Sequence, residues 1–169
     1  MPDDIRDRAE TERRLWDEIE SGGGTGMLGL TGDTAQLPQP MTAFVEREGN
    51  LLWFFSRDDS DFVRTVGAAS RALFTVQYDK LQAAIVGDLA VGLDRERRDR
   101  FWGPTVAAWY PGGKDDPHLT MLRLACREAQ VWVASVGPIG FAWEIARANV
   151  TKTIPDIGGS TEVTFDQRR

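Results

Sequence analysis

Short apolar runs separated by polar turns dominate the chain, and their pattern predicts a mainly antiparallel β protein. Residues 41–47 alternate so that Met41, Ala43 and Val45 share one face, which is the period of a half-buried strand. A polar reversal follows, and the apolar run 51–56 comes directly after it. The two segments are therefore predicted to pair as a β-hairpin.

The remaining segments complete the expected order of elements. Further strands are predicted at residues 27–31, 73–78, 83–93, 119–125 and 130–135, with a bulge at Gly87 and a turn at 126–128. Helices are predicted at residues 5–20, 60–70, 94–102, 104–110 and 138–150, and the tail from residue 157 is expected to add an edge strand or stay loose. Short strands with helices inserted between them indicate a mainly β (α+β) fold. We expect an antiparallel barrel with peripheral helices, not alternating βαβ units.

The length of 169 residues fits a single domain, with the barrel at about residues 27–135. The first helix carries Leu15, Trp16 and Ile19 at helical spacing, so it is expected to dock on the barrel by this stripe. A net charge of -6 argues against binding to nucleic acid or to an anionic membrane. The chain has no apolar run of about 18 residues and no signal-peptide core at its start, so a cytoplasmic location is expected.

Reactive side chains are scarce. One cysteine, Cys126, permits no internal disulfide, and one histidine, His118, leaves no zinc cluster of the usual Cys/His type, so no metal is predicted. A catalytic triad would have to use His118, but no G-x-S-x-G turn accompanies it. Cys126 is interpreted as a partly buried structural thiol. If the protein is an enzyme, its own side chains are not expected to supply the reactive centre, and catalytic residues are not assigned.

The segment that follows the apolar run 51–56 offers a candidate anion site. A buried strand, a polar turn and Ser60 at a helix start can together hold a phosphate on free backbone N–H groups. Asp58, Asp59 and Asp61 crowd the same turn, and their charges repel a phosphate dianion. Two interpretations of Ser60 therefore stay open: a helix cap alone, or a cap that also binds phosphate.

Six tryptophans are many for a chain of this length. Each alone is most simply a packing residue, whereas together they favour burial against a partner subunit or a planar cofactor. Trp132 is predicted to face opposite to Val131 and Val133, towards a neighbouring subunit or the edge of a ligand. Trp109 and Tyr110 are interpreted as a dimer contact in preference to a cofactor contact.

The order of several motifs resembles a known family. The segment Gln39-Pro40-Met41, then LLWFFSRDDS, FWGPTVAAWYPGGKDDP and LTMLRL, is similar to the general stress protein 26 branch of the pyridoxamine 5′-phosphate oxidase-like superfamily. The resemblance runs from about residue 15 to residue 165. It implies a split β-barrel that binds FMN, works as a homodimer with flavin sites at the subunit boundary, and acts as an oxidoreductase on an unknown small molecule.

The resemblance also supplies a set of candidate cofactor-binding residues: Gln39, Pro40, Met41, Phe54, Phe55, Ser56, Ser60 and Arg64, to which Trp132 is added. Judged from the sequence alone, without the resemblance, Phe54 and Phe55 are more simply explained as core residues than as flavin contacts. Two positions depart from the family pattern, because Gln39 stands where relatives have an arginine and Phe62 where they have a lysine that reaches the FMN phosphate. The loss of two charge-assisted hydrogen bonds weakens FMN by roughly two to four orders of magnitude. Arg57 and Arg64 offer partial compensation.

Several functions follow from these features. The first is a flavoprotein that exchanges electrons with a small molecule, and the second is a dimer that kept the barrel but lost the cofactor. A third is a relative that binds deazaflavin or haem, although nothing in the sequence singles this out. Pyridoxamine-phosphate oxidation itself is not expected, because we find no second arginine–serine group for a substrate phosphate.

Overall fold

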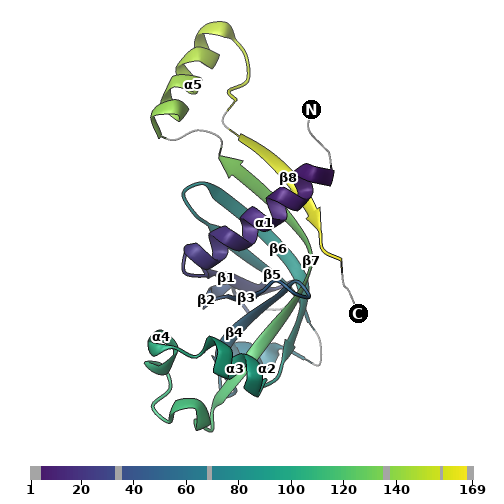
Figure 1. Ribbon diagram of the computed structural model, residues 1–169, viewed down its shortest axis with the longest axis vertical. Coiled ribbons are helices and arrows are strands. Elements are labelled where there is room, and N and C mark those ends of the chain that lie inside the picture. Colours follow the sequence, from purple (N-terminus) through teal and green to yellow (C-terminus); the bar gives the residue numbers. More distant parts are fainter. Residues whose placement is uncertain (1–4, 33–35, 68–69, 135–137, 157, 167–169) are drawn as a thin grey trace.

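The structure is a computed structural model that describes residues 5–32, 36–67, 70–134, 138–156 and 158–166. Its eight strands form one antiparallel sheet in the order β2-β1-β5-β6-β7-β4-β3, with β8 paired to β7 (Figure 1). The strands are β1 (Thr25–Leu30), β2 (Gln39–Thr42), β3 (Phe44–Glu46), β4 (Leu51–Arg57), β5 (Ser70–Gln77), β6 (Leu81–Val91), β7 (Leu119–Ala134) and β8 (Gly158–Thr164). The helices are α1 (Ile5–Ser21), α2 (Asp61–Thr65), α3 (Arg95–Phe101), α4 (Pro104–Ala107), the 3₁₀ turn η1 (Gly113–Asp115) and α5 (Pro138–Thr151).

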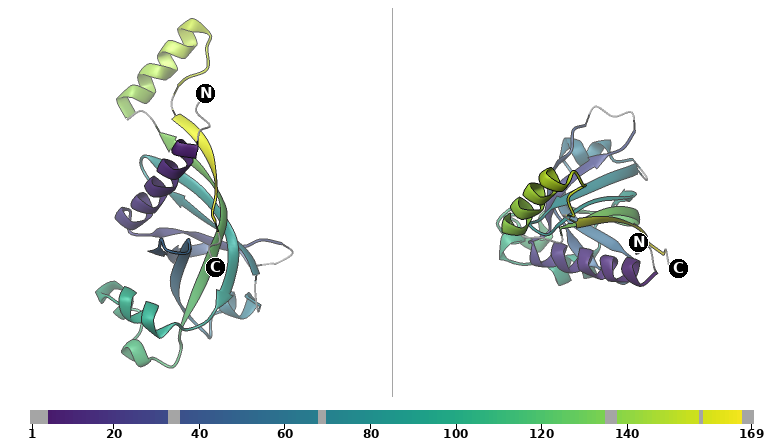
Figure 2. Two further views of the ribbon diagram at one scale, coloured as in Figure 1. Left: turned by 45° about the vertical axis from the view of Figure 1, so that its right-hand side comes forward. Right: turned by 90° about the horizontal axis from the view of Figure 1, so that it is seen from above.

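The sheet curls back on itself because its two end strands belong to one segment of chain. β2 pairs with β1, β3 pairs with β4, and only Ala43 separates β2 from β3. The backbone N–H of Ala43 donates to the carbonyl oxygen of Gly24, which fastens this junction to the loop between α1 and β1. Figures 1 and 2 show the resulting curled sheet with helices around it. The predicted mainly β split-barrel class is therefore confirmed.

The main core fills the inside of the curled sheet and is closed by α1. Leu15, Trp16 and Ile19 are buried, as the helical stripe predicts, and Trp16 packs against Phe165 with ring centroids 5.2 Å apart. The predicted alternation in 41–47 is also confirmed, because Ala43 and Val45 lie in this core. The single strand expected there is divided at Ala43 into β2 and β3. The reversal into β4 uses two residues with positive φ, Gly49 at 97° and Asn50 at 55°, which are residue types that tolerate this conformation.

The predicted turn at 126–128 is wrong, because β7 runs through it as one strand of 16 residues. The register shifts there: Val86 lies opposite Glu128, and Gly87 lies opposite Cys126, so Arg127 is an extra residue in β7. The bulge predicted at Gly87 is thus confirmed. A Cβ at Gly87 would lie 2.3 Å from the carbonyl oxygen of Ala125, so the partner strand can approach only a glycine here.

Other predicted elements need correction at their ends, and the helix expected at 104–110 already ends at Ala107. The helix expected at 60–70 ends at Thr65, because Val66 adopts an extended conformation, and β5 already begins at Ser70.

Cys126 is completely buried, not partly buried, and this burial raises the pKa of its thiol. The tail does add a strand, since β8 pairs with the second half of β7.

The last helix, α5, is connected to the ends of β7 and β8 and stands away from the curled sheet (Figures 1 and 2). Its bounds, Pro138–Thr151, match the predicted helix at 138–150. No helix in the described residues combines the length and the apolar composition needed to cross a membrane.

Candidate functional site

The first group of candidate residues lies on β2, next to β1. Gln39 and Met41 are half-buried and point to the same side of the strand, and Gln39 Nε2 lies 3.7 Å from Met41 Sδ. Pro40 is exposed and lies opposite Met27 in the register with β1. β2 is a short strand at one end of the sheet with an exposed proline as its second residue, so part of its edge is free for contact with a ligand or a partner.

The second group, on β4, is divided between two faces of the sheet. Phe54 is fully buried and packs edge-on against Phe74 in the main core, with centroids 5.2 Å apart. Phe55 points to the other face, where it packs edge-on against Phe44. Ser56 is buried, at 9% exposure. Since neighbouring strand residues alternate in direction, the side chains of these three residues cannot line one surface together.

The turn after β4 places Ser60 as a helix cap. Its hydroxyl oxygen accepts a hydrogen bond from the backbone N–H of Val63 at 3.2 Å, which is the cap predicted from the sequence. The two cations of this turn are both engaged by carboxylates. Arg57 donates through Nε and Nη2 to the two oxygens of Asp59, each at 2.9 Å, and exposed Arg64 lies 3.7 Å from Asp61.

Replacing the cap tests the local role of Ser60. We expect Ser60→Ala to lower the free energy of unfolding by about 1 kcal/mol, because an N–H of α2 loses its partner. Ser60→Asn should retain most of the stability, since the asparagine carbonyl also caps helices. Urea denaturation of the three proteins measures the difference. A cap role would be contradicted if Ser60→Ala were as stable as Ser60→Asn.

The position at which the family resemblance implies a phosphate-binding lysine is buried in this chain. Phe62 is 1% exposed and belongs to the main core, together with its neighbour Val63. Its side chain therefore points away from the solvent side of the turn, where a phosphate would lie. The departure noted in the sequence thus removes a cation and places an aromatic ring in the core at this position.

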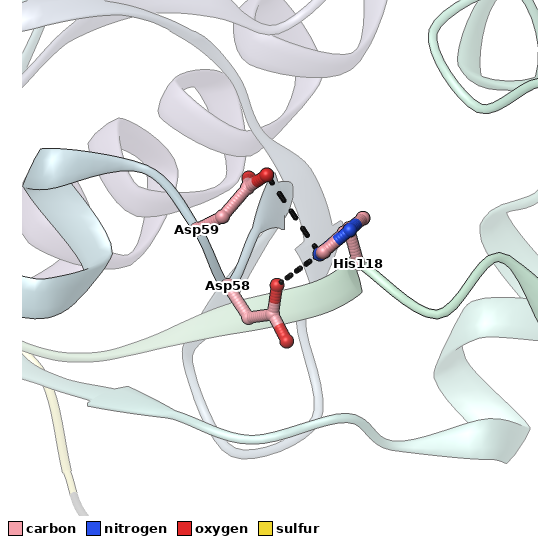
Figure 3. Close-up of side chains that lie close together, drawn as sticks. All are labelled: Asp58, Asp59 and His118. Atoms are coloured by element: carbon pink, nitrogen blue, oxygen red, sulfur yellow. Dashed lines mark hydrogen bonds and ion pairs between the residues drawn. The ribbon is translucent and has the colours of Figure 1, made fainter.

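His118 joins the same turn from the start of β7, as Figure 3 shows. Its Nδ1 lies 3.0 Å from Asp58 Oδ1 and 3.7 Å from Asp59 Oδ2. Within the described residues these three side chains come close enough to share a metal ion, with ligand atoms within 4.8 Å of one another. All three are exposed, and Arg57 already occupies both oxygens of Asp59, so the group is explained as a hydrogen-bonded surface cluster.

A further aspartate, Asp116, adds a negative charge close to the turn after β4. Asp116 accepts hydrogen bonds from the backbone N–H groups of His118 at 2.9 Å and Gly112 at 3.1 Å, and these bonds lower the pKa of its carboxyl. The hydrogen bond from Arg57 likewise lowers the pKa of Asp59. Both groups are therefore ionised at neutral pH. The carboxyl end of β4 is an acidic surface whose nearest arginine is neutralised, and it suits a phosphate poorly.

Trp132 lies far along β7 from the candidates on β4 and α2. It pairs with Gln82 and Ser160, whereas Ser56 pairs with Thr120, twelve residues earlier on the same strand. At about 3.3 Å per residue this separation is roughly 40 Å. Trp132 is 46% exposed, on the face opposite to buried Val131. Within one chain it therefore cannot share a site with the residues of β4 and α2.

An apolar hollow lies next to β2, beside the first group of candidate residues. It has a volume of about 460 Å³ and is lined by residues of β1, β5 and the segment before Gln39: Met27, Gly29, Leu30, Leu37, Pro38 and Leu73, with Thr31 and Thr75. Ligand pockets in proteins have volumes of about 300–1,000 Å³. The residues present thus fit the ring system of a flavin, whereas the acidic turn does not fit its phosphate.

Sequence reasoning missed a buried ion pair that fixes α3 to the barrel. Glu46, 7% exposed, accepts hydrogen bonds from Trp53 Nε1 at 2.7 Å and from Arg97 Nη2 at 2.9 Å. A glutamate at the end of a predicted strand gave no signal of this contact. The hydrogen bond from Arg97, with a further one from Trp53, keeps the pKa of Glu46 below its ordinary value against the opposing effect of burial.

An aromatic cluster over the outer face of β4 was also missed as a unit. Tyr110 is 5% exposed and packs near Phe55 and Trp102, with centroids 6.4 and 6.1 Å away. Burial raises the pKa of Tyr110 to about 12, so its hydroxyl is protonated at neutral pH. Tyr110 is thus an internal packing residue, whereas its neighbour Trp109 is 76% exposed.

The curled sheet, the β2 segment and the turn at the end of β4 define the class of protein. Residues 10–156 match the profile of the family described as pyridoxamine 5′-phosphate oxidase like, so the chain belongs to this family.

Its solved relatives include a general stress protein 26 from a Jannaschia species, 31% identical, with 94% of this chain and 99% of that chain covered and a TM-score of 0.77. A general stress FMN/FAD binding protein from Xanthomonas citri is 38% identical, with 74% and 89% covered and a TM-score of 0.68. A general stress family protein from Xanthomonas campestris is 36% identical, with 81% and 93% covered and a TM-score of 0.70. A search of curated proteins found no match.

Proposed function

We propose that this protein is a cytoplasmic flavin-binding oxidoreductase of the general stress protein type, with FMN as its cofactor, and that it works as a homodimer. The observation that carries the proposal is the 38% identity, over 74% of this chain, to a Xanthomonas citri protein described as binding FMN or FAD. A flavin brings its own redox chemistry, so the protein needs only to bind, orient and tune it. This agrees with a chain whose single thiol is buried and whose single histidine lies in a hydrogen-bonded surface cluster.

The homodimer is supported by the position of Trp132. Gln39, Pro40 and Met41 would hold the flavin from one subunit, close to the apolar hollow. Trp132, roughly 40 Å along β7 from the level of Ser56, could meet the candidate residues of β4 and α2 only from a second subunit. The ring system would supply the electron-transfer centre, while the backbone of β2 and the apolar hollow would exclude water from its face.

The acidic turn leads to a specific expectation about the phosphate. In this chain Arg57 is paired with Asp59, and Phe62 is buried, so the phosphate should add little to the affinity. We therefore expect FMN and riboflavin to bind with dissociation constants within about tenfold of each other, which is less than one full charge-assisted hydrogen bond. Titration of each flavin into the purified protein, followed by flavin and tryptophan fluorescence, measures both constants.

Gln39→Arg is the matched variant for this experiment. A new guanidinium beside the flavin site should tighten FMN by about tenfold or more and leave riboflavin unchanged. Wild-type binding of FMN more than 100-fold tighter than riboflavin would show that the phosphate is held after all. Binding of neither flavin, nor of FAD, would reject the proposal.

A second candidate function is a split-barrel dimer that no longer binds a cofactor. It is favoured by one specific feature, the replacement of both expected cations by Gln39 and buried Phe62 beside three aspartates. A colourless protein that takes up no added flavin, but still dimerises, would support this candidate against the first.

A further inference from the structure

The α5 helix displays apolar side chains on more than one face, although it stands away from the curled sheet (Figures 1 and 2). Ile139, Trp143 and Val150 are 88%, 68% and 83% exposed, and Ala146 between them is also exposed. The spacing of these four residues is four, three and four, which places them in one stripe along the helix and is typical of a helix that packs on another protein surface. We call these four residues the α5 stripe.

The opposite face of α5 already has contacts within the chain. Ala148 is buried, and Phe141 lines a hollow of about 580 Å³ with Trp132, Leu81 and residues at the start of β8. The two charged residues of the helix neutralise each other, because Arg147 Nη2 donates to Glu144 Oε2 at 2.7 Å. A helix that is apolar on both faces and has no net charge needs a second partner to cover it.

We propose that the α5 stripe is an interface with a second copy of this chain. The undescribed residues of this sequence come in runs of at most four, each too short to cover a helix of 14 residues. The α5 stripe alone offers on the order of 500 Å² of accessible surface, more than half of the roughly 800 Å² per partner of a stable interface. A surface without charge and with a central exposed tryptophan has the composition of an interface core.

The geometry also suits a two-fold symmetric contact. Each copy carries both a projecting apolar helix and, at its base, an open hollow that contains Trp132. In an isologous dimer each copy presents the same surface to the other, so one contact covers both helices and closes the assembly. This inference rests on the dimer in the proposed function. The inference identifies the surface that forms the dimer contact. This surface lies at the same end of the molecule as Trp132.

Analytical ultracentrifugation of the flavin-free protein over a range of concentrations tests the inference. We expect wild type to sediment as a dimer, and Trp143→Glu to weaken dimerisation by about 100-fold or more, because a central tryptophan is replaced by a charge. Val150→Glu, at the other end of the stripe, should act in the same direction. The comparison variant is Trp109→Glu, which changes a tryptophan of 76% exposure near α4. Under this inference it should remain dimeric, whereas the interpretation of Trp109 as a dimer contact predicts that it dissociates.

Circular dichroism establishes that each variant is folded, and hydrogen exchange of α5 should be slow in dimeric wild type and fast in Trp143→Glu. The inference is overturned if Trp143→Glu and Val150→Glu sediment like wild type, or if Trp109→Glu alone dissociates. Binding to neutral phosphatidylcholine vesicles that Trp143→Glu abolishes would instead assign the stripe to a lipid surface. A monomeric wild type that still binds FMN would reject the dimer and this inference but leave the flavin proposal standing.

Discussion

Glu46→Ala is expected to lower the free energy of unfolding by about 3 kcal/mol, because it removes one partner of a buried ion pair. Trp53 Nε1 and two guanidinium nitrogens of Arg97 lose their acceptor. The Arg97 side chain is 29% exposed and can turn to water, so the loss should fall at the lower end of the range for buried pairs. Thermal or urea unfolding measures the change, and α3 should be the element that loosens first.

The same pair gives stability a defined pH dependence. The pKa of Glu46 is lowered in the folded protein, chiefly by the hydrogen bond from Arg97, so its contribution is complete above the ordinary carboxyl value of 4.5. As the pH falls below that value, the folded state must accept a proton and the contribution is lost. Wild type should therefore exceed Glu46→Gln in stability at pH 7, and the difference should shrink below about pH 4.5.

Glu48→Ala provides the control for this experiment, because Glu48 is exposed and lies two residues further along the chain. Its stability should stay within about 0.5 kcal/mol of wild type at both pH values. If Glu46→Ala were as stable as this control, or if the Glu46→Gln difference did not change with pH, the ion pair would contribute nothing to the fold.

Local patterns predicted most of the architecture. Period-two alternation identified the β3–β4 hairpin, and the apolar stripe of α1 identified its buried face. The strand β7 was misread because Arg127 and Glu128 look like a turn in sequence. In the structure they stay exposed on a bulged strand, where Arg127 Nε donates to Asp88 at 2.7 Å. Asp88 lies on β6, 39 residues away, so local sequence could not reveal this pairing.

The candidate site was less predictable for a related reason. The residue types at the end of β4 were recognised, but their function depends on which charges meet. The bidentate bond between Arg57 and Asp59 removes a cation that the sequence offered for phosphate, and His118 enters from a segment 60 residues away. Strand alternation predicts that Phe54 and Phe55 point to opposite faces of the sheet. Only the fold shows which of these faces is the inside of the barrel.

Phe62→Lys is expected to be the most destabilising single change near the proposed flavin site. The family resemblance suggests this substitution together with Gln39→Arg as a way to rebuild the phosphate-binding cations. The structure argues against the first half of that design. Phe62 is 1% exposed, and loss of a buried phenylalanine alone costs about 3–5 kcal/mol before the cost of burying an ammonium is added.

Comparison of Phe62→Lys with Phe62→Leu separates the charge from the lost volume. We expect the leucine variant to lose about 1–1.5 kcal/mol, and the lysine variant at least 4 kcal/mol, which would leave much of a marginally stable domain unfolded. Melting temperatures measured with saturating FMN and with saturating riboflavin then locate the introduced ammonium. Equal stabilisation by the two flavins is expected if the side chain stays at the core. A larger stabilisation of the lysine variant by FMN would mean that α2 can turn this position towards the phosphate, and that the buried ring of Phe62 blocks a site the fold still retains.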